Sequence, residues 1–351
     1  MPTKEQVIEA LKPVEDPELH RSIVDLNMVE SVKIRDSIVV IIIKLTIAGC
    51  PLKAKIEKDV SDAVMALDGV EKVSVEFTSM NDEERAALRK QILGDSAGEE
   101  DKVPHIADHL LAISSGKGGV GKSTVTANLA RAFAEKGMKV GVLDADVYGF
   151  SIPRMMGVTE DPTVIDNMII PAESKGIKVV SMGFFVPDNA PVVWRGPLLH
   201  KAISQFMTDA VWDNLDVLLL DLPPGTGDVT ITIAQKLPEA QLVVVTTPQP
   251  AAAAVASRVA GMAEKTNLSV LGVIENMSYY LLPDDTKEYI FGKDGGRMLA
   301  SDIKTKFLGE IPLDKRIREF ADSGRSLFDE AGDSKLAQIY RGIRDSITES
   351  F

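Results

Sequence analysis

The chain has 351 residues, a hydrophobic content of 45% and a formal net charge of −13, so it is long enough for two domains with substantial cores. Its acidic balance disfavours non-specific binding to nucleic acid, and it has no run of about 18 apolar residues that would form a membrane span. A single cysteine, Cys50, rules out an internal disulfide framework, and the charged first residues lack the apolar core of a signal peptide, so we expect a cytoplasmic protein.

Residues 1–79 are expected to form a small α+β domain. Periodic apolar patterns predict two helices, and β-branched or alternating runs predict two strands. These elements cover residues 3–11, 38–43, 54–67 and 70–77. Between residues 80 and 104, acidic clusters flank a short helical pattern and a segment rich in small residues. This composition is typical of a linker, so we interpret residues 80–104 as an acidic linker.

Residues 105–351 are expected to form a larger α/β domain. Short apolar strands alternate there with helical patterns. The predicted strands cover residues 110–114, 140–144, 177–182, 217–221, 242–246, 270–276 and 307–311. Buried apolar strands that alternate with helices indicate a doubly wound, mostly parallel sheet, in which ligands bind at the carboxyl ends of the strands.

A glycine-rich segment follows the first of these strands. Residues 116–123 read Gly-Lys-Gly-Gly-Val-Gly-Lys-Ser and fit G-x-x-x-x-G-K-[ST], the phosphate-binding loop of P-loop nucleotidases. Its backbone N–H groups would surround a phosphate, Lys122 supplies a positive charge, and Ser123 would ligate Mg²⁺. The residues expected to bind nucleotide here are Gly116, Lys117, Gly118, Gly119, Val120, Gly121, Lys122, Ser123 and Thr124.

A second interpretation of this segment has to be weighed. Its glycines also satisfy G-x-G-x-x-G, and Asp144 follows at a spacing that suits a dinucleotide-binding fold. That alternative explains neither Lys122 nor the apolar strand of residues 217–221. The strand ends in Asp221, as a Walker B segment does when it holds Mg²⁺. The two motifs together favour a nucleotidase that binds ATP or GTP.

The lysine at the second position of the loop marks a subclass. Residues 117–123 resemble the deviant Walker A motif of the MinD/ParA/nitrogenase-iron-protein class, in which this lysine crosses a dimer interface to the partner's nucleotide. The resemblance implies a homodimer in which Lys117 and Lys122 are catalytic, because a cation delivered in trans stabilises charge on the transferring phosphoryl group. The alternative is that Lys117 only faces solvent.

Three further side chains are implied by the same resemblance. Asp144 and Asp146 match the first switch of the class, with Asp146 orienting the attacking water and Asp144 nearer the metal; the alternative is that one of them caps a turn. Residues 221–228 match the second switch, whose glycines permit movement. Asn276 follows a strand where the class binds adenine, with capping as the alternative. The implied ligands of Mg²⁺ are Ser123, Asp144 and Asp221.

Longer segments resemble one family within this class, the Mrp iron–sulfur cluster carriers. The likeness covers nearly all of residues 105–351 and rests on residues 141–149, 194–197, 221–228, 274–278 and 291–296. In the first domain, residues 16–19 and 46–51 resemble a small iron–sulfur assembly domain that often precedes Mrp proteins. The resemblance implies a dimeric ATPase that uses ATP and Mg²⁺ and acts with apoprotein targets or iron–sulfur assembly factors.

One departure from the family concerns its cysteines. Mrp carriers usually place a C-x-x-C after the Asn-Met-Ser segment, where two subunits bind one cluster, but residues 279–286 contain no cysteine. A four-iron cluster normally needs four thiolates, and a homodimer of this chain offers only two, both Cys50. We therefore expect no cluster on the larger domain. The alternative function is a ParA- or MinD-like spatial or assembly switch that carries no cluster.

Cys50 itself precedes Pro51, where a helix start would lower the pKa of the thiol. That setting suits a reactive thiol or a transient metal ligand. The alternative is that Cys50 is a small buried apolar side chain.

The last helical pattern of the chain carries an apolar stripe over residues 336–347. MinD-like proteins bind membranes through a terminal amphipathic helix, but those helices are basic, whereas acids and bases are balanced here. The pattern therefore favours packing against the body of the protein over membrane binding.

Overall fold

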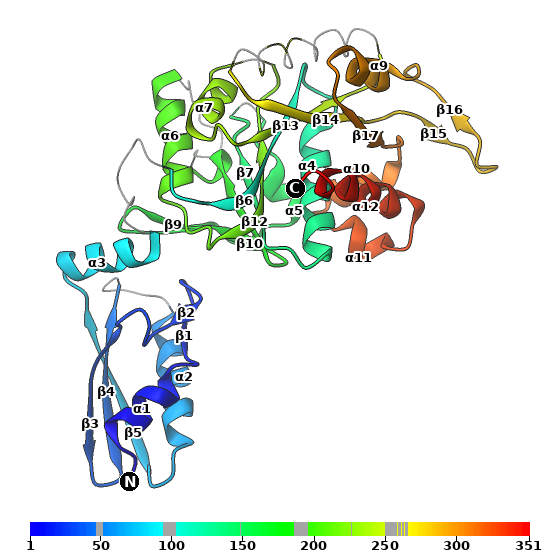
Figure 1. Ribbon diagram of the computed structural model, residues 1–351. Helices are drawn as coiled ribbons and strands as arrows, with labels where there is room; N and C mark the ends of the chain where they lie inside the picture. The colour runs from blue at the N-terminus through cyan, green and yellow to red at the C-terminus, as the bar shows by residue number, and fades with distance from the viewer. Residues whose placement is uncertain are drawn as a thin grey trace. The chain divides into compact units, whose positions relative to one another are not determined.

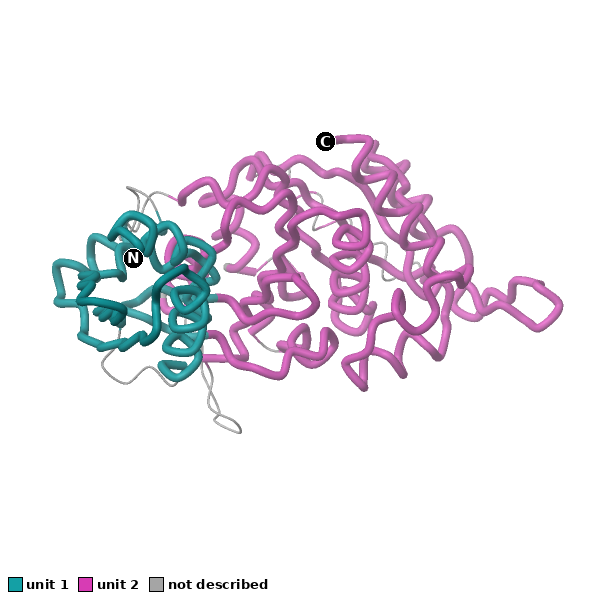
Figure 2. Tube along the Cα trace, turned by 90° about the horizontal axis from the view of Figure 1, so that it is seen from below, with its two compact units in different colours: residues 1–97, 163–170 teal, residues 98–162, 171–351 magenta. Residues whose placement is uncertain are grey.

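The computed structural model describes residues 1–46, 52–93, 103–147, 149–185, 196–225, 227–249, 258, 261, 263 and 266–351. The chain divides into two compact units, coloured teal and magenta in Figure 2. The first comprises residues 1–97 and 163–170, and the second comprises residues 98–162 and 171–351. Within the described ranges, no helix is both long and apolar enough to cross a membrane.

The first unit is built on a three-stranded sheet of order β3-β4-β5, in which β3 is antiparallel and β5 parallel to β4. Alternate residues of β4 are buried, as its β-branched run predicts, and α2 packs on β5. Two minor strand pairs, β1–β2 and β8–β9, complete the unit. Its elements are α1 (Lys4–Leu11), β1 (Glu15–Asp16), β2 (Arg21–Ser22), β3 (Val29–Arg35), β4 (Ile38–Leu45), α2 (Lys53–Met65), β5 (Lys72–Ser79), α3 (Asp82–Leu93), β8 (Thr163–Ile165) and β9 (Met168–Ile170).

Residues 80–104, which composition marks as an acidic linker, begin with a helix. The first turn of α3 holds three acidic residues, which the positive end of the helix dipole favours. Leu88 of α3 is buried, and Glu84 pairs with Lys44 of β4. These contacts make α3 part of the first unit. Acid-rich composition alone does not separate a linker from the solvated face of a docked helix.

The second unit is built on an eight-stranded sheet of order β10-β11-β7-β12-β6-β13-β14-β17 (Figure 1). All neighbouring strands are parallel except β10, which is antiparallel to β11 at one edge. The strands are β6 (Ala107–Ser115), β7 (Val140–Asp144), β10 (Ala172–Ser174), β11 (Ile177–Ser181), β12 (Leu215–Asp221), β13 (Gln241–Thr246), β14 (Ser269–Glu275) and β17 (Lys306–Glu310). The predicted doubly wound, mostly parallel sheet is confirmed.

Helices cover both faces of this sheet, with α4 and α12 on one face and α6 and α7 on the other (Figure 1). Phe133 of α4 and Tyr340 of α12 are buried in one apolar core with residues of the central strands. The terminal stripe therefore packs against the body, as predicted. The helices are α4 (Lys122–Glu135), α5 (Ile152–Met156), α6 (Gly196–Thr208), α7 (Asp228–Lys236), α9 (Gly295–Asp302), α10 (Lys315–Asp322), α11 (Leu327–Ala331) and α12 (Lys335–Thr348), with a short 3₁₀ helix at Met182–Phe185.

The strand order brings distant segments to one edge of the sheet. β6 lies between β12 and β13, and β12 also pairs with β7, where Asp221 is opposite Asp144. Because these strands are parallel, their carboxyl ends lie at the same edge. The glycine-rich loop after β6 therefore meets the acids that end β7 and β12.

Candidate functional site

The loop between β6 and α4 forms a pocket of about 220 Å³. Gly119 and Gly121 have φ values of 80° and 81°, a left-handed conformation that other residues rarely adopt. α4 begins directly afterwards, so its unpaired N–H groups face the pocket and favour an anion. The described residues that line the pocket are Ser115, Lys117, Gly118, Gly119, Val120, Gly121, Lys122, Ser123, Thr124, Asp146, Gly149, Ser151, Met155 and Pro224.

Lys122 and Asp221 form a buried ion pair at the base of this loop. Lys122 Nζ lies 2.7 Å from Asp221 Oδ2 and 3.6 Å from Asp146 Oδ2. The side chain of Lys122 is 5% exposed and that of Asp221 is 0% exposed. Each charge compensates the other for the loss of water. The ammonium group of Lys122, which we expect to bind phosphate, thus lies at the loop and is balanced by the carboxylate of Asp221.

Two hydroxyl groups also converge on Asp221. Ser123 Oγ donates to Oδ2 at 2.6 Å, and Thr126 Oγ1 donates to Oδ1 at 2.7 Å. A hydroxyl beside a buried carboxylate supplies the oxygen ligands that Mg²⁺ prefers. The donor set of Ser123 and Asp221 therefore fits Mg²⁺ held next to a phosphate.

Asp144, the last residue of β7, is fully buried and is not among the residues that line the pocket. Its Oδ2 accepts hydrogen bonds from Ser181 Oγ at 3.0 Å and from the backbone N–H of Ser151 at 3.2 Å, while Oδ1 accepts one from the N–H of Asp146 at 3.2 Å. Burial, together with the negative charge of Asp221, raises the pKa of Asp144 to about 7. In this arrangement Asp144 orients the backbone that carries Asp146, whose own side chain reaches the pocket.

Asn276 lies directly behind the glycine loop. Its Nδ2 donates to the carbonyl oxygen of Val120 at 2.8 Å, and the side chain is buried. A Cβ added to Gly121 would lie 2.3 Å from the same nitrogen, and φ is 81° there, so a larger residue would displace the Asn276 amide and strain the backbone. The residue predicted to bind adenine is therefore in contact with the loop that is predicted to bind phosphate.

Lys117 also lines the pocket, and its contact is with its own chain. Lys117 Nζ donates to Gln249 Oε1 at 3.1 Å. The second switch approaches the same place, because the N–H of Gly225 donates to the carbonyl oxygen of Ser115 at 2.7 Å and Pro224 lines the pocket. Lys117, Lys122 and Asp146 thus line one cavity, and their roles in hydrolysis stay predictions.

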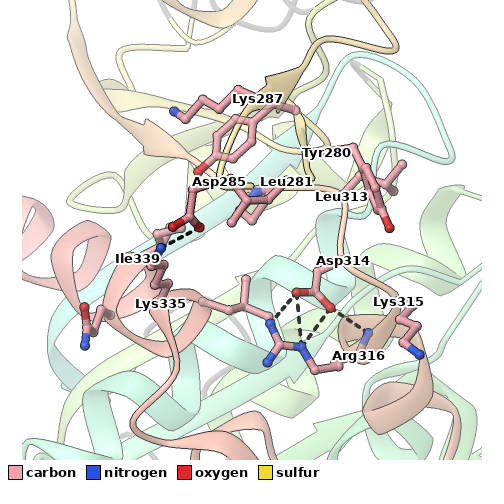
Figure 3. Close-up of a pocket in the computed structure, with 14 residues that line it drawn as sticks. Tyr280, Leu281, Asp285, Lys287, Leu313, Asp314, Lys315, Arg316, Lys335 and Ile339 are labelled. Carbon is pink, nitrogen blue, oxygen red and sulfur yellow. Dashed lines mark hydrogen bonds and ion pairs between the residues drawn. The ribbon is translucent and has the colours of Figure 1, made fainter. Parts of the chain in front are cut away.

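A larger pocket of about 660 Å³ follows the ends of β14 and β17, beside residues 279–286, which contain no cysteine (Figure 3). One wall is the hairpin of β15 (Tyr280–Leu281) and β16 (Lys287–Glu288). Asp285 at the tip of this hairpin pairs with Lys335 at 2.7 Å, and both side chains are about two-thirds exposed. Lys287 Nζ lies 3.8 Å from the centre of the Tyr279 ring. Ion pairs and tyrosine rings occupy the segment where the resemblance to Mrp carriers led us to look for a C-x-x-C.

Several residues singled out in the sequence lie outside the described part of the structure: Cys50, Trp194, Arg195 and Thr226. Conversely, the structure adds Thr126, Ser181 and Gln249 to the surroundings of the site. Thr126 could have been found from its helical spacing to Lys122. Ser181 ends β11, where the pairing with β7 places it opposite Asp144. Gln249 gives no signal in the sequence.

Two family models match this chain. The model described as "NUBPL iron-transfer P-loop NTPase" matches residues 106–348, and the one described as "Iron-sulfur cluster assembly protein" matches residues 4–77. The predicted resemblance to an iron–sulfur carrier with an N-terminal assembly domain is thereby confirmed.

Relatives along the whole chain point the same way. An iron-sulfur cluster carrier protein of Mycobacterium tuberculosis is 48% identical over 350 residues, covering 97% of this chain and 91% of the relative. One of Bacillus subtilis is 39% identical over 350 residues, covering 98% of this chain and 97% of the relative.

Solved structures resemble about two thirds of the chain. A nucleotide-binding protein from Archaeoglobus fulgidus in complex with ADP is 39% identical, with a TM-score of 0.58, over 67% of this chain and 92% of that one. The cell division ATPase MinD from Pyrococcus furiosus, 22% identical with a TM-score of 0.54 over 70% of this chain and 100% of that one, shares the fold. On the match to residues 106–348 and the identity to full-length relatives, the chain belongs to the NUBPL iron-transfer P-loop NTPase family.

Proposed function

We propose that this protein is a cytoplasmic, dimeric ATPase that assembles iron–sulfur clusters or delivers them to apoproteins. The observation that carries the ATPase part is the convergence of Lys122, Ser123 and Asp221 at the carboxyl ends of β6 and β12. The match of residues 4–77 to an iron–sulfur assembly domain, and the names of the full-length relatives, support the cluster part.

The residues of the pocket have separate tasks in hydrolysis. The loop N–H groups and Lys122 bind the β- and γ-phosphates, and Asp146 orients the attacking water. Bound Mg²⁺, held by Ser123 and Asp221, would neutralise the negative charge that the phosphates share. Lys117 crosses to the nucleotide of the partner, where its charge stabilises the transition state. Asp144 holds the segment that carries Asp146 in place.

The cluster is cargo in this proposal, and Cys50 is the one thiol of the chain that could hold it. A dimer supplies two thiolates where a four-iron cluster normally takes four. The remaining ligands would therefore come from the donor or acceptor protein, which suits a species in transfer. A second candidate function, an ATP-driven assembly switch without cargo, is favoured by the lack of any cysteine in residues 105–351.

Anaerobic reconstitution of the full chain with iron and sulfide separates the two candidates. The carrier should bind iron and sulfide in equal amounts and absorb visible light, and Cys50→Ser should lose both while keeping ATP hydrolysis. Cys50→Ala serves as a second thiol-free variant that adds no oxygen ligand. If wild-type protein takes up no more iron than Cys50→Ser, the chain carries no cluster. The assembly switch would then be the remaining candidate function.

A further inference from the structure

Lys117 and Gln249 lie on loops that follow neighbouring strands. β6 and β13 are parallel, with Ser115 opposite Val245, so the segments beyond them leave the same edge of the sheet. There Lys117 Nζ donates to Gln249 Oε1 at 3.1 Å, across 132 residues of sequence. Both side chains are half-buried. The contact holds the ammonium group of Lys117 beside a loop of its own chain.

The chemistry of the contact suits reversible retention. Among the residues that the structure describes, no carboxylate pairs with Lys117, whereas Lys122 has Asp221 at 2.7 Å. An amide oxygen is a neutral acceptor and holds an ammonium group less strongly than a carboxylate does. Lys122 is thus fixed by an ion pair, and Lys117 is held by a contact that it can leave.

We propose that Gln249 is a positioning residue that keeps Lys117 on its own chain until a second ATP-bound copy docks. The inference rests on the proposed function, in which Lys117 acts on the partner's nucleotide. Because Gln249 belongs to the same chain as Lys117, Nζ must leave it to reach across the interface. Part of the free energy of dimerisation is spent on breaking this contact, so Gln249 sets the protein concentration at which the ATPase becomes active.

Variants of Gln249 test this directly. Gln249→Ala removes the acceptor, and Gln249→Glu replaces it with a carboxylate of nearly the same shape. We expect the protein concentration that gives half-maximal ATPase activity to fall about three- to tenfold in Gln249→Ala and to rise by a similar factor in Gln249→Glu. The affinity of the isolated chain for ATP should not change, because Lys122 binds the phosphates. Gln338→Glu, a matched change at an exposed residue of α12, should behave as wild type.

A double-mutant cycle shows whether Gln249 acts through Lys117. Dimerisation is measured by sedimentation with a non-hydrolysable ATP analogue, so that variants without ATPase activity can be compared. In the Lys117→Ala background, Gln249→Ala and Gln249→Glu should have no further effect. Gln249 variants that match wild type, or whose effects persist without Lys117, would overturn the inference. A Lys117→Ala variant with wild-type ATPase activity would instead overturn the proposed role of Lys117.

Discussion

Ser123 Oγ lies 2.6 Å from Asp221 Oδ2, which joins the first turn of α4 to the last residue of β12 across 98 residues of sequence. The same carboxylate also holds Lys122. The phosphate loop and the start of the second switch therefore share one anchor. Any change in the charge beside Ser123 acts on both segments, which is the physical basis for coupling the state of the nucleotide to a surface elsewhere.

Removing the buried ammonium group should affect both binding and folding. Lys122→Ala is expected to weaken ATP binding and abolish hydrolysis, since the β- and γ-phosphates lose their fixed cation. It also leaves Asp221 buried without a counter-charge, which should lower the free energy of unfolding by about 3–5 kcal/mol. Calorimetric titration and urea unfolding measure the two effects. Lys136→Ala at the other end of α4, where the lysine is half-exposed, should change neither.

Removing the first lysine of the loop should separate binding from hydrolysis. Lys117→Ala is expected to bind ATP almost as wild type does but to hydrolyse it about 10³-fold more slowly, because it lacks the cation supplied in trans. Lys117→Arg, which keeps the charge, should recover part of the rate. Equal rates of hydrolysis for Lys117→Ala and wild type would show that Lys117 does not act on the partner's nucleotide.

The base preference should depend on Asn276. If its amide binds adenine, ATP should bind roughly 10- to 100-fold more tightly than GTP, and Asn276→Ala should reduce that ratio. Competition between the two nucleotides for a fluorescent ATP analogue measures it. Asn128→Ala is a suitable control, because Asn128 also donates an amide hydrogen bond to a backbone carbonyl, that of Thr124, away from Asn276. The same dissociation constant for ATP and GTP would contradict the assignment.

The raised pKa of Asp144 predicts a pH-dependent stability of the nucleotide-free protein. With a pKa of about 7 when folded and 3.8 as its ordinary value, Asp144 keeps its proton in the folded chain and releases it on unfolding between these pH values. The contribution of this proton to the free energy of unfolding is therefore complete below about pH 4 and is lost as the pH rises to about 7. Urea midpoints in EDTA should fall with rising pH more steeply for wild type than for Asp144→Asn. Parallel curves for the two proteins would rule out this titration.

The sequence predicts most of what depends on local pattern. The strand expected over residues 140–144 is β7 as observed, and the rule that parallel strands end at one edge brings Asp144 and Asp221 together. The segment of α3 is different, because Asp82 and Glu83 face water, while one buried leucine and the pair of Glu84 with Lys44 dock the helix. Periodicity cannot detect so narrow an apolar face.

Contacts between residues of distant loops could not be predicted from the sequence. Gln249 meets Lys117 only because β13 is the neighbour of β6, and strand order is not encoded in any one segment. The same holds for Asn276 and Val120, which are 156 residues apart. The motifs of the site could therefore be predicted from the sequence. The contacts between their residues could be seen only in the folded structure.

The central position of β6 in the sheet has a consequence for the folding of the protein during its synthesis on the ribosome. The sheet of the first unit uses strands from residues 29–79 and is complete early, but β6 waits for β12 and β13 to fill both of its edges. Asp221 leaves the ribosome 98 residues after Ser123, a delay of roughly 5–20 s at about 5–20 residues per second. For that time the nascent chain displays an apolar strand with two open edges, a target for chaperones. A chain halted before residue 221 carries every glycine of the loop and lacks the acid that organises it.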